Sequence, residues 1–170
     1  METLAKLEPV FIKDEKGTVT AGNSSQTNDA AACVVVASAE ACAKYGLKPK
    51  MRLVAYAAVG VDPAYMGIGP VPATRKALER AGLKAADMDV IEANEAFAAQ
   101  ALAVCRDLDL DPAKVNPNGS GISIGHPVGA TGALITVKAL YELQRTGGRY
   151  ALVTMCIGGG QGIAAIFERI

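Results

Sequence analysis

The uncharged stretch from Tyr150 to Phe167 narrows the possible folds of this chain more than any other segment. Its length and apolar character would suit a membrane-spanning helix, but the residues GGGQG at Gly158–Gly162 interrupt its centre. Glycine is unfavourable in a helix interior, and a run of glycines favours a turn. The stretch therefore predicts two buried strands, Tyr150–Met155 and Ile163–Phe167, joined by a glycine turn.

Strand and helix patterns alternate ahead of that hairpin. Short β-branched apolar runs predict strands, and apolar positions three or four residues apart predict helices. In chain order, the predicted elements are a strand at Ala30–Ala39, a helix ending at Gly46, a strand at Arg52–Val59, a loop at Gly60–Pro72, a helix at Thr74–Arg80, a strand at Val90–Ile91, a helix opened by Asn94, and a helix from Pro127 or Val128 to Gly147. This order indicates a layered α/β domain with helices packed on a mixed sheet.

The first 48 residues contain too little regular structure to form a hydrophobic core of their own. The chain of 170 residues is long enough for one well-packed domain with an appendage, but short for two independent cores. No flexible linker separates this front segment from the rest. We therefore expect it to belong to a domain whose remainder lies elsewhere.

The charge balance argues against nucleic-acid binding. The chain has 17 Lys and Arg against 17 Asp and Glu, and only 5% of its residues are aromatic, with no tryptophan. Basic surface and stacking side chains, on which nucleic-acid binding relies, are both scarce. We expect neither nucleic acid nor a membrane among the partners of this protein.

The cysteine spacing and the first residues predict a cytoplasmic protein with reduced thiols. Cys33, Cys42, Cys105 and Cys156 form no CxxC pair and have no histidine cluster nearby, which argues against a disulfide framework and a zinc site. The residues METLAK at the start contain no apolar core of a secretory signal. We expect no bound metal and no export.

His126, the single histidine, lies between Gly125 and Pro127 at the start of a predicted helix. The positive potential of a helix N-terminus favours a neutral ring, which can donate to a developing oxyanion. The alternative is a capping or surface histidine. The surrounding glycines favour function, because they let a ligand approach the backbone.

Cys156 and Asn94 each follow a predicted strand. Cys156 opens the segment CIGGGQG, whose backbone N–H groups can stabilise a thiolate or an oxyanion, although a buried structural cysteine is the common alternative. Asn94 fits a helix N-cap at least as well as it fits a residue that holds a catalytic water. The glycines between Gly119 and Gly132 match neither the P-loop nor the dinucleotide-binding pattern.

Three segments, NEAFAAQ (Asn94–Gln100), NGSGISIGHPVGATGA (Asn118–Ala133) and CIGGGQG (Cys156–Gly162), resemble the C-terminal signatures of thiolases, the acetyl-CoA acetyltransferases or β-ketothiolases. The upstream segments Thr20–Ala32 and Gly60–Leu78 also resemble thiolase sequence, so the resemblance covers nearly the whole chain. It is strongest to the bacterial biosynthetic and polyhydroxyalkanoate-linked β-ketothiolases.

The resemblance implies a five-layer α/β fold of two similar halves. Residues 1–48 would be the closing segment of the N-terminal domain, and residues 49–170 the C-terminal domain. The nucleophilic cysteine of thiolases lies in the N-terminal half, outside these 170 residues. The implied partners are that half, acyl-CoA and acetyl-CoA, and further subunits of a homo- or hetero-oligomer. Coenzyme A thioesters would be substrates, and no cofactor is implied.

The resemblance also implies catalytic roles for four residues. His126 would activate the nucleophilic cysteine and help to polarise a thioester oxygen, and Asn94 would assist through a bound water. Cys156 would remove or return the α-proton of the second acyl-CoA. The backbone N–H of Gly158 would contribute to an oxyanion hole.

Three further residues would contact the substrate by the same resemblance. Ser25 would contact the pantetheine arm of coenzyme A, and Met66 and Phe97 would line the acyl pocket. Simple core packing is an equally good explanation of these side chains from the sequence alone.

Three functional hypotheses follow. The first is the C-terminal portion of a β-ketoacyl-CoA thiolase that catalyses reversible condensation and thiolysis. The second is a noncatalytic module that binds coenzyme A or assists subunit assembly. The third is a freestanding cysteine hydrolase that uses Cys156 and His126, for which the sequence offers no third orienting group. Acyl chain length and the physiological direction stay open.

Overall fold

A four-stranded sheet forms the centre of the computed structural model, which describes residues 2–170. The strands are β1 (Met51–Gly60), β2 (Val90–Ala93), β3 (Tyr150–Ile157) and β4 (Gln161–Arg169), in the order β1-β4-β3-β2. β4 pairs antiparallel with both β1 and β3, whereas β2 and β3 run parallel. The sheet is therefore mixed, which confirms the prediction from the alternating pattern.

β3 and β4 form the predicted hairpin around the glycine turn. The turn occupies Gly158–Gly160, and Ile157 lies opposite Gln161 at the last pair of the ladder. Gly159 and Gly160 have φ angles of 87° and 91°, which residues with a side chain rarely adopt. Both strands extend beyond their predicted bounds because they stay paired up to the turn.

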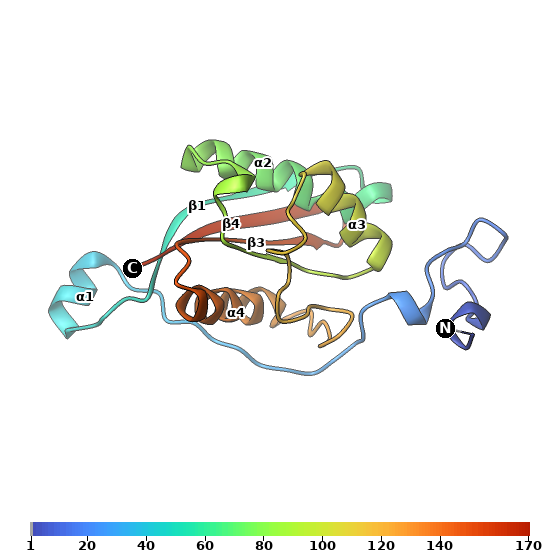
Figure 1. Ribbon diagram of the computed structural model, residues 1–170, viewed down its shortest axis with the longest axis horizontal. Helices are drawn as coiled ribbons and strands as arrows, with labels where there is room; N and C mark the ends of the chain where they lie inside the picture. Colours follow the sequence, from blue (N-terminus) through green and yellow to red (C-terminus); the bar gives the residue numbers. More distant parts are fainter. Residues whose placement is uncertain (1) are drawn as a thin grey trace.

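Helices cover the two faces of the sheet in separate layers (Figure 1). α2 (Pro70–Ala81) and α3 (Ala98–Asp107) lie on one face, and α4 (Thr131–Thr146) lies on the other. Successive side chains of a strand point to opposite faces, so Leu152 of β3 packs into the core beneath α2 while Val153 packs against α4. Among the described residues, no helix is both long and apolar enough to cross a membrane.

α2 begins earlier than predicted and ends where predicted. It starts at Pro70, ahead of Thr74, because proline fits the first turn of a helix, and it stops at the left-handed Gly82. Two 3-10 helices flank it, η3 (Pro63–Ile68) and η4 (Ala85–Asp87). The predicted loop Gly60–Pro72 therefore contains regular structure.

α4 begins at Thr131 and not at Pro127 or Val128. Residues Pro127–Ala130 form a separate turn, in which the Pro127 carbonyl accepts from the backbone N–H of Ala130 at 2.7 Å. The helix ends at the left-handed Gly147, as predicted.

The front segment lies apart from the sheet for most of its length (Figure 1). Its regular elements are the 3-10 helices η1 (Leu4–Lys6) and η2 (Ala21–Asn23) and the short helix α1 (Ala39–Tyr45). The Ser38 side chain caps α1 by accepting from the backbone N–H of Ala41, and the helix ends at Gly46 as predicted.

The strand predicted at Ala30–Ala39 is wrong. Residues 30–38 have no regular structure and pair with no other strand in the described part of the chain, and Val35 and Val36 are each 89% exposed. A β-branched run becomes a strand only beside a second strand that satisfies its backbone groups and covers its side chains. Within the described residues, no second strand covers the apolar side chains of this run.

Candidate active site

The carboxyl ends of the two parallel strands bring Asn94 and Cys156 to one edge of the sheet. Ala93, the last residue of β2, pairs with Thr154 of β3, so Asn94 lies just beyond β2 and Cys156 just beyond that pair. The backbone N–H of Asn94 donates to the Thr154 carbonyl at 3.0 Å. Asn94 thus extends the sheet and does not open a helix, since α3 begins at Ala98.

Asn116 connects the loop that carries His126 to the end of β2 through hydrogen bonds. Its backbone N–H donates to the Ile91 carbonyl at 2.7 Å, and its side-chain amide accepts from the N–H of Ala93 (2.9 Å) and donates to the carbonyl of Ala93 (2.8 Å). The side chain therefore replaces a peptide group of a neighbouring strand. Asn116 has a φ of 49°, a left-handed conformation that asparagine tolerates.

His126 is held by one buried side chain at each ring nitrogen. Its Nδ1 lies 2.7 Å from Thr131 Oγ1, and its Nε2 lies 3.3 Å from the side-chain nitrogen of Asn94. Burial lowers the pKa of His126 below its ordinary value of 6.5, because an imidazolium would lose solvation there. The ring is therefore neutral near neutral pH, because burial disfavours its charged form.

The front segment crosses the site and is tied to it by backbone hydrogen bonds. The N–H of Ser25 donates to the Ala96 carbonyl at 2.9 Å. The N–H of His126 is shared between the Gln26 carbonyl (3.2 Å) and Asn28 Oδ1 (3.0 Å). These bonds place Ser25 beside the loop that follows β2 and beside the histidine.

Gly125 makes this crossing possible. It has a φ of 114°, and a Cβ atom built on it would lie 2.1 Å from Asn28 Oδ1. Only glycine lets the Asn28 side chain approach this backbone so closely. This is the local reason for a glycine directly before His126.

A cavity of about 340 Å³ lies between these segments. Its lining residues are Ser25, Met66, Ala96, Phe97, His126, Val128, Met155, Cys156, Ile157 and Gly158. Every site residue predicted from the sequence lines this cavity, apart from Asn94, whose side chain contacts His126 Nε2. The structure therefore brings all of them together, although their chemical roles stay predictions.

Burial keeps Cys156 in its thiol form. The side chain is 7% exposed, and desolvation raises the pKa of the thiol, whereas a backbone hydrogen bond lowers it by less. The sequence predicts that the glycine-rich turn can stabilise a thiolate, but here desolvation outweighs that effect. Cys156 therefore carries its proton near neutral pH.

A buried ion pair links α4 to β2 and to the loop that carries His126. Glu92 of β2 is fully buried, and Lys138 Nζ lies 2.7 Å from its Oε2. The same Nζ donates to the carbonyl of Gly119 in the histidine loop. Burial raises the pKa of Glu92 in spite of Lys138, so this ion pair holds the loop in place at an electrostatic cost.

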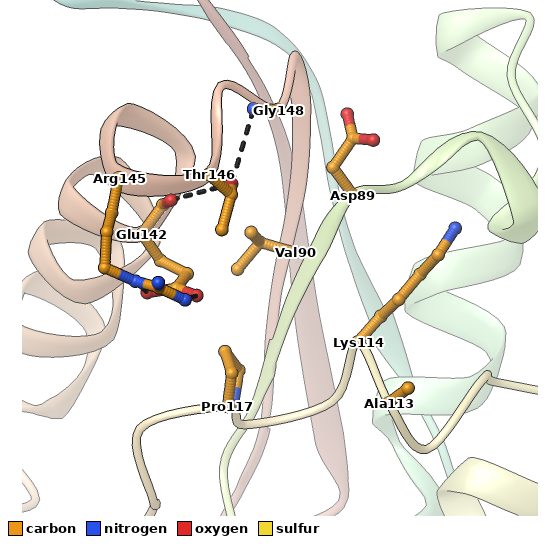
Figure 2. Close-up of a pocket in the computed structure, with 9 residues that line it drawn as sticks. All are labelled: Asp89, Val90, Ala113, Lys114, Pro117, Glu142, Arg145, Thr146 and Gly148. Carbon is orange, nitrogen blue, oxygen red and sulfur yellow. Dashed lines mark hydrogen bonds and ion pairs between the residues drawn. The ribbon is translucent and has the colours of Figure 1, made fainter.

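A second hollow of about 310 Å³ lies at the other end of β2, between Asp89 and the end of α4 (Figure 2). Its polar groups already have protein partners. Glu142 accepts from Arg145 and Asn118, which lower its pKa to about 2, and Lys114 Nζ donates to backbone carbonyls. This hollow therefore offers few free groups for a ligand.

The other cysteines do not form a second site. Cys33 is exposed, whereas Cys42 and Cys105 are partly buried in α1 and α3, and all are unpaired. Cysteine is commonly buried as a small apolar side chain, which is the structural role that the sequence favours for these three, and the exposed Cys33 does not fit it. Across residues 2–170, no three side chains of His, Cys, Asp or Glu gather closely enough to hold a metal ion.

Sequence reasoning missed three residues that shape the site: Asn28, Asn116 and Thr131. Each acts through a hydrogen bond to a residue of another segment or turn. The sequence carried only a weak signal, an asparagine or threonine in an irregular or helix-opening stretch.

Comparison with known proteins relates this site to one family. The family model described as "Thiolase, C-terminal domain" matches residues 47–169, and that described as "Thiolase, N-terminal domain" matches residues 1–40. The Beta-ketothiolase BktB of Cupriavidus necator is 72% identical over 170 residues, which cover 100% of this chain and 43% of that protein. The acetyl-CoA acetyltransferase of Shinella zoogloeoides is 54% identical, with the same coverage.

Solved structures show the same likeness. The crystal structure of the Bacillus anthracis acetyl-CoA acetyltransferase matches with a TM-score of 0.94 at 51% identity, over 99% of this chain and 42% of that one. Human mitochondrial 3-ketoacyl-CoA thiolase in complex with CoA matches with a TM-score of 0.90 at 49% identity, with the same coverage. These matches confirm the predicted fold class. The chain spans less than half the length of the relatives it matches.

Proposed function

Because this chain belongs to the thiolase family, we propose that it is the C-terminal portion of a β-ketoacyl-CoA thiolase. It would act together with an N-terminal half that supplies the nucleophilic cysteine. The proposal rests on one observation: the neutral His126 and the Cys156 thiol both line a single cavity, and the Asn94 side chain contacts His126 Nε2. A proton acceptor and a proton donor are thus held ready beside the same space.

The first step would be acyl transfer. His126 Nε2 takes the proton of the nucleophilic thiol, whose sulfur attacks the thioester carbonyl carbon. As the bond from that carbon to the coenzyme A sulfur breaks, Cys156 gives its proton to the departing thiolate. The raised pKa of Cys156 supports this order, because the residue starts protonated.

The second step would form the carbon–carbon bond. Cys156, now a thiolate, removes the α-proton of a second acyl-CoA, and the resulting carbanion attacks the acyl-enzyme carbonyl. The enzyme thioester breaks, and its sulfur regains the proton from His126. A water held by Asn94 and the backbone N–H of Gly158 would stabilise the oxyanions of the two steps.

The cavity wall supports a thioester with an apolar acyl group as the substrate. Met66, Phe97 and Ile157 are apolar, and they suit an acyl chain more than a charged group. Ser25 stands at the rim through its backbone bond to Ala96 and would contact the pantetheine arm.

A noncatalytic module is the second candidate. Its support is the exposed apolar run around Val35 and Val36, which offers a contact surface to another chain and carries no catalytic group. In that case the chain would bind coenzyme A or assist subunit assembly without turnover.

We expect thiolysis only from the assembled protein. This chain is combined with the part of the Cupriavidus necator relative that it does not match, and cleavage of acetoacetyl-CoA by coenzyme A is followed. Each component alone should be inactive, and the combination should accumulate an acylated cysteine in the added half, detected by mass spectrometry. Coenzyme A binding without turnover in the combination would favour the noncatalytic module. Turnover by this chain alone would refute the need for the added half.

The acid limb of the pH profile should lie below the ordinary histidine value. The pKa of His126 is lowered by burial, so its neutral form, the proton acceptor, persists to a pH below 6.5 and is lost as the pH falls through the lowered pKa. The assembled enzyme should therefore lose kcat/KM for acylation only below that value. An acid limb centred above 6.5 would contradict this assignment of His126.

A further inference from the structure

We propose that Thr131 is a positioning residue that sets the tautomer of His126, with the proton on Nδ1 and the lone pair on Nε2. This inference deepens the proposed function and rests on it for its catalytic consequence. Its structural part, the tautomer itself, stands on the hydrogen bonds around the ring.

The direction of the Thr131 hydroxyl decides where the ring proton lies. Thr131 Oγ1 donates to the Pro127 carbonyl at 2.9 Å, the bond that threonine often makes to the carbonyl one helical turn earlier. A hydroxyl has one proton, so toward His126 Nδ1, at 2.7 Å, the oxygen accepts. Nδ1 therefore carries hydrogen in this arrangement.

The other ring nitrogen agrees with this assignment. The side-chain nitrogen of Asn94 lies 3.3 Å from His126 Nε2, and an amide nitrogen can only donate, so Nε2 accepts. Two side chains on different segments thus assign the same tautomer. Nε2 then carries the lone pair that a base toward a thiol requires, and a thiol that donates to it would take the place of the Asn94 amide.

A competing arrangement exists and explains why Thr131 is needed. Asn94 Oδ1 is buried and has no hydrogen-bond partner. If the Asn94 amide turned over, Oδ1 would face the ring and would accept from a protonated Nε2. The Thr131 hydroxyl, which is 1% exposed and beyond the reach of bulk water, holds the ring against that change.

Thr131 acts on the histidine and not on the substrate. Its side chain is absent from the lining of the cavity, where His126 itself is present. Removing the hydroxyl should therefore lower kcat and leave KM nearly unchanged, because Nε2 would then carry the ring proton and could not accept the proton of the thiol.

The tautomer can be read by NMR, because His126 is the single histidine of this chain. This chain is prepared with isotope-labelled histidine, assembled with the unlabelled half used above, and compared as wild type, Thr131→Val and Thr131→Ser. Wild type and Thr131→Ser should show the proton on Nδ1, and Thr131→Val should show it mainly on Nε2. kcat for thiolysis should fall at least about tenfold in Thr131→Val and stay within about threefold in Thr131→Ser, with KM unchanged within about twofold in both.

Several outcomes would overturn the proposal. A wild-type ring with its proton on Nε2 refutes it without any variant, as does a Thr131→Val ring that keeps the Nδ1 proton, or a Thr131→Ser protein that behaves like Thr131→Val. A Thr131→Val protein that changes tautomer but keeps full kcat refutes the catalytic part. If the tautomer changes as expected but even the wild-type assembly shows no thiolysis, the proposed function fails while the tautomer assignment holds.

Discussion

Replacing His126 with glutamine should lower kcat for thiolysis by the assembled enzyme about a thousandfold, the range typical of a lost general base. Glutamine keeps a polar side chain of similar reach, but its amide cannot accept the proton of a thiol. The nucleophilic cysteine would then attack mainly as the poorly reactive thiol. Steady-state kinetics with acetoacetyl-CoA and coenzyme A, together with the rate at which the acylated cysteine forms, measure the effect.

Val128→Ala is the matched control for this experiment. Val128 lines the same cavity two positions from His126 in the sequence, but it is 72% exposed and carries no titratable group. Its kcat should stay within about threefold of wild type. If His126→Gln folds normally and retains more than about a tenth of the wild-type kcat, the histidine is not the base, because a general base contributes far more than that.

The sequence predicted the sheet and its hairpin well, because those elements depend on local patterns. The glycine turn between two apolar runs predicted β3 and β4, and left-handed glycines predicted the ends of α1, α2 and α4. These signals act within a few residues, so a single sequence contains them.

The failures share a different cause. The run Ala30–Ala39 has strand composition but no neighbouring strand in the described residues, and Asn94 has N-cap chemistry but bonds to β3. Pro127 fits the first turn of a helix, yet it begins a separate turn ahead of α4. In the first two cases a contact with a distant segment, or the lack of one, overrides the local preference.

The candidate site was predicted chiefly by resemblance, and its geometry was not. The surrounding glycines favoured a functional role for His126, but Asn94 and Cys156 kept ordinary structural explanations. Only the fold shows that they meet at the carboxyl edge of β2 and β3. The partner of His126 at Nδ1, Thr131, left no mark in the sequence that separates it from any other helix-opening threonine.

Gly162→Ala should lower the free energy of unfolding by about 3 kcal/mol or more, the upper range of overpacking substitutions. A Cβ atom on Gly162 would lie 2.0 Å from the backbone carbonyl carbon and oxygen of Gly69, and backbone cannot move aside as a flexible side chain can. Gly162 is the second residue of β4, and Gly69 joins η3 to α2. Thermal and denaturant unfolding followed by circular dichroism measure the loss.

This crossing also shapes the cavity. η3 carries Met66, a lining residue, and the contact between Gly69 and Gly162 holds η3 against the start of β4 and hence beside the turn at Gly158. If the alanine variant folds at all, separation of the two backbones should therefore displace Met66 and raise KM for the acyl-CoA.

Gly60→Ala tests whether tight approach is the cause of this destabilisation, and not the loss of glycine from the sheet. Gly60 ends β1, the strand next to β4, and a Cβ atom there would meet no atom closer than 4.0 Å. We expect this control to change the free energy of unfolding by less than about 1 kcal/mol. Equal losses in the two variants would contradict the steric explanation, because only Gly162 lies against a backbone that leaves no room for a side chain.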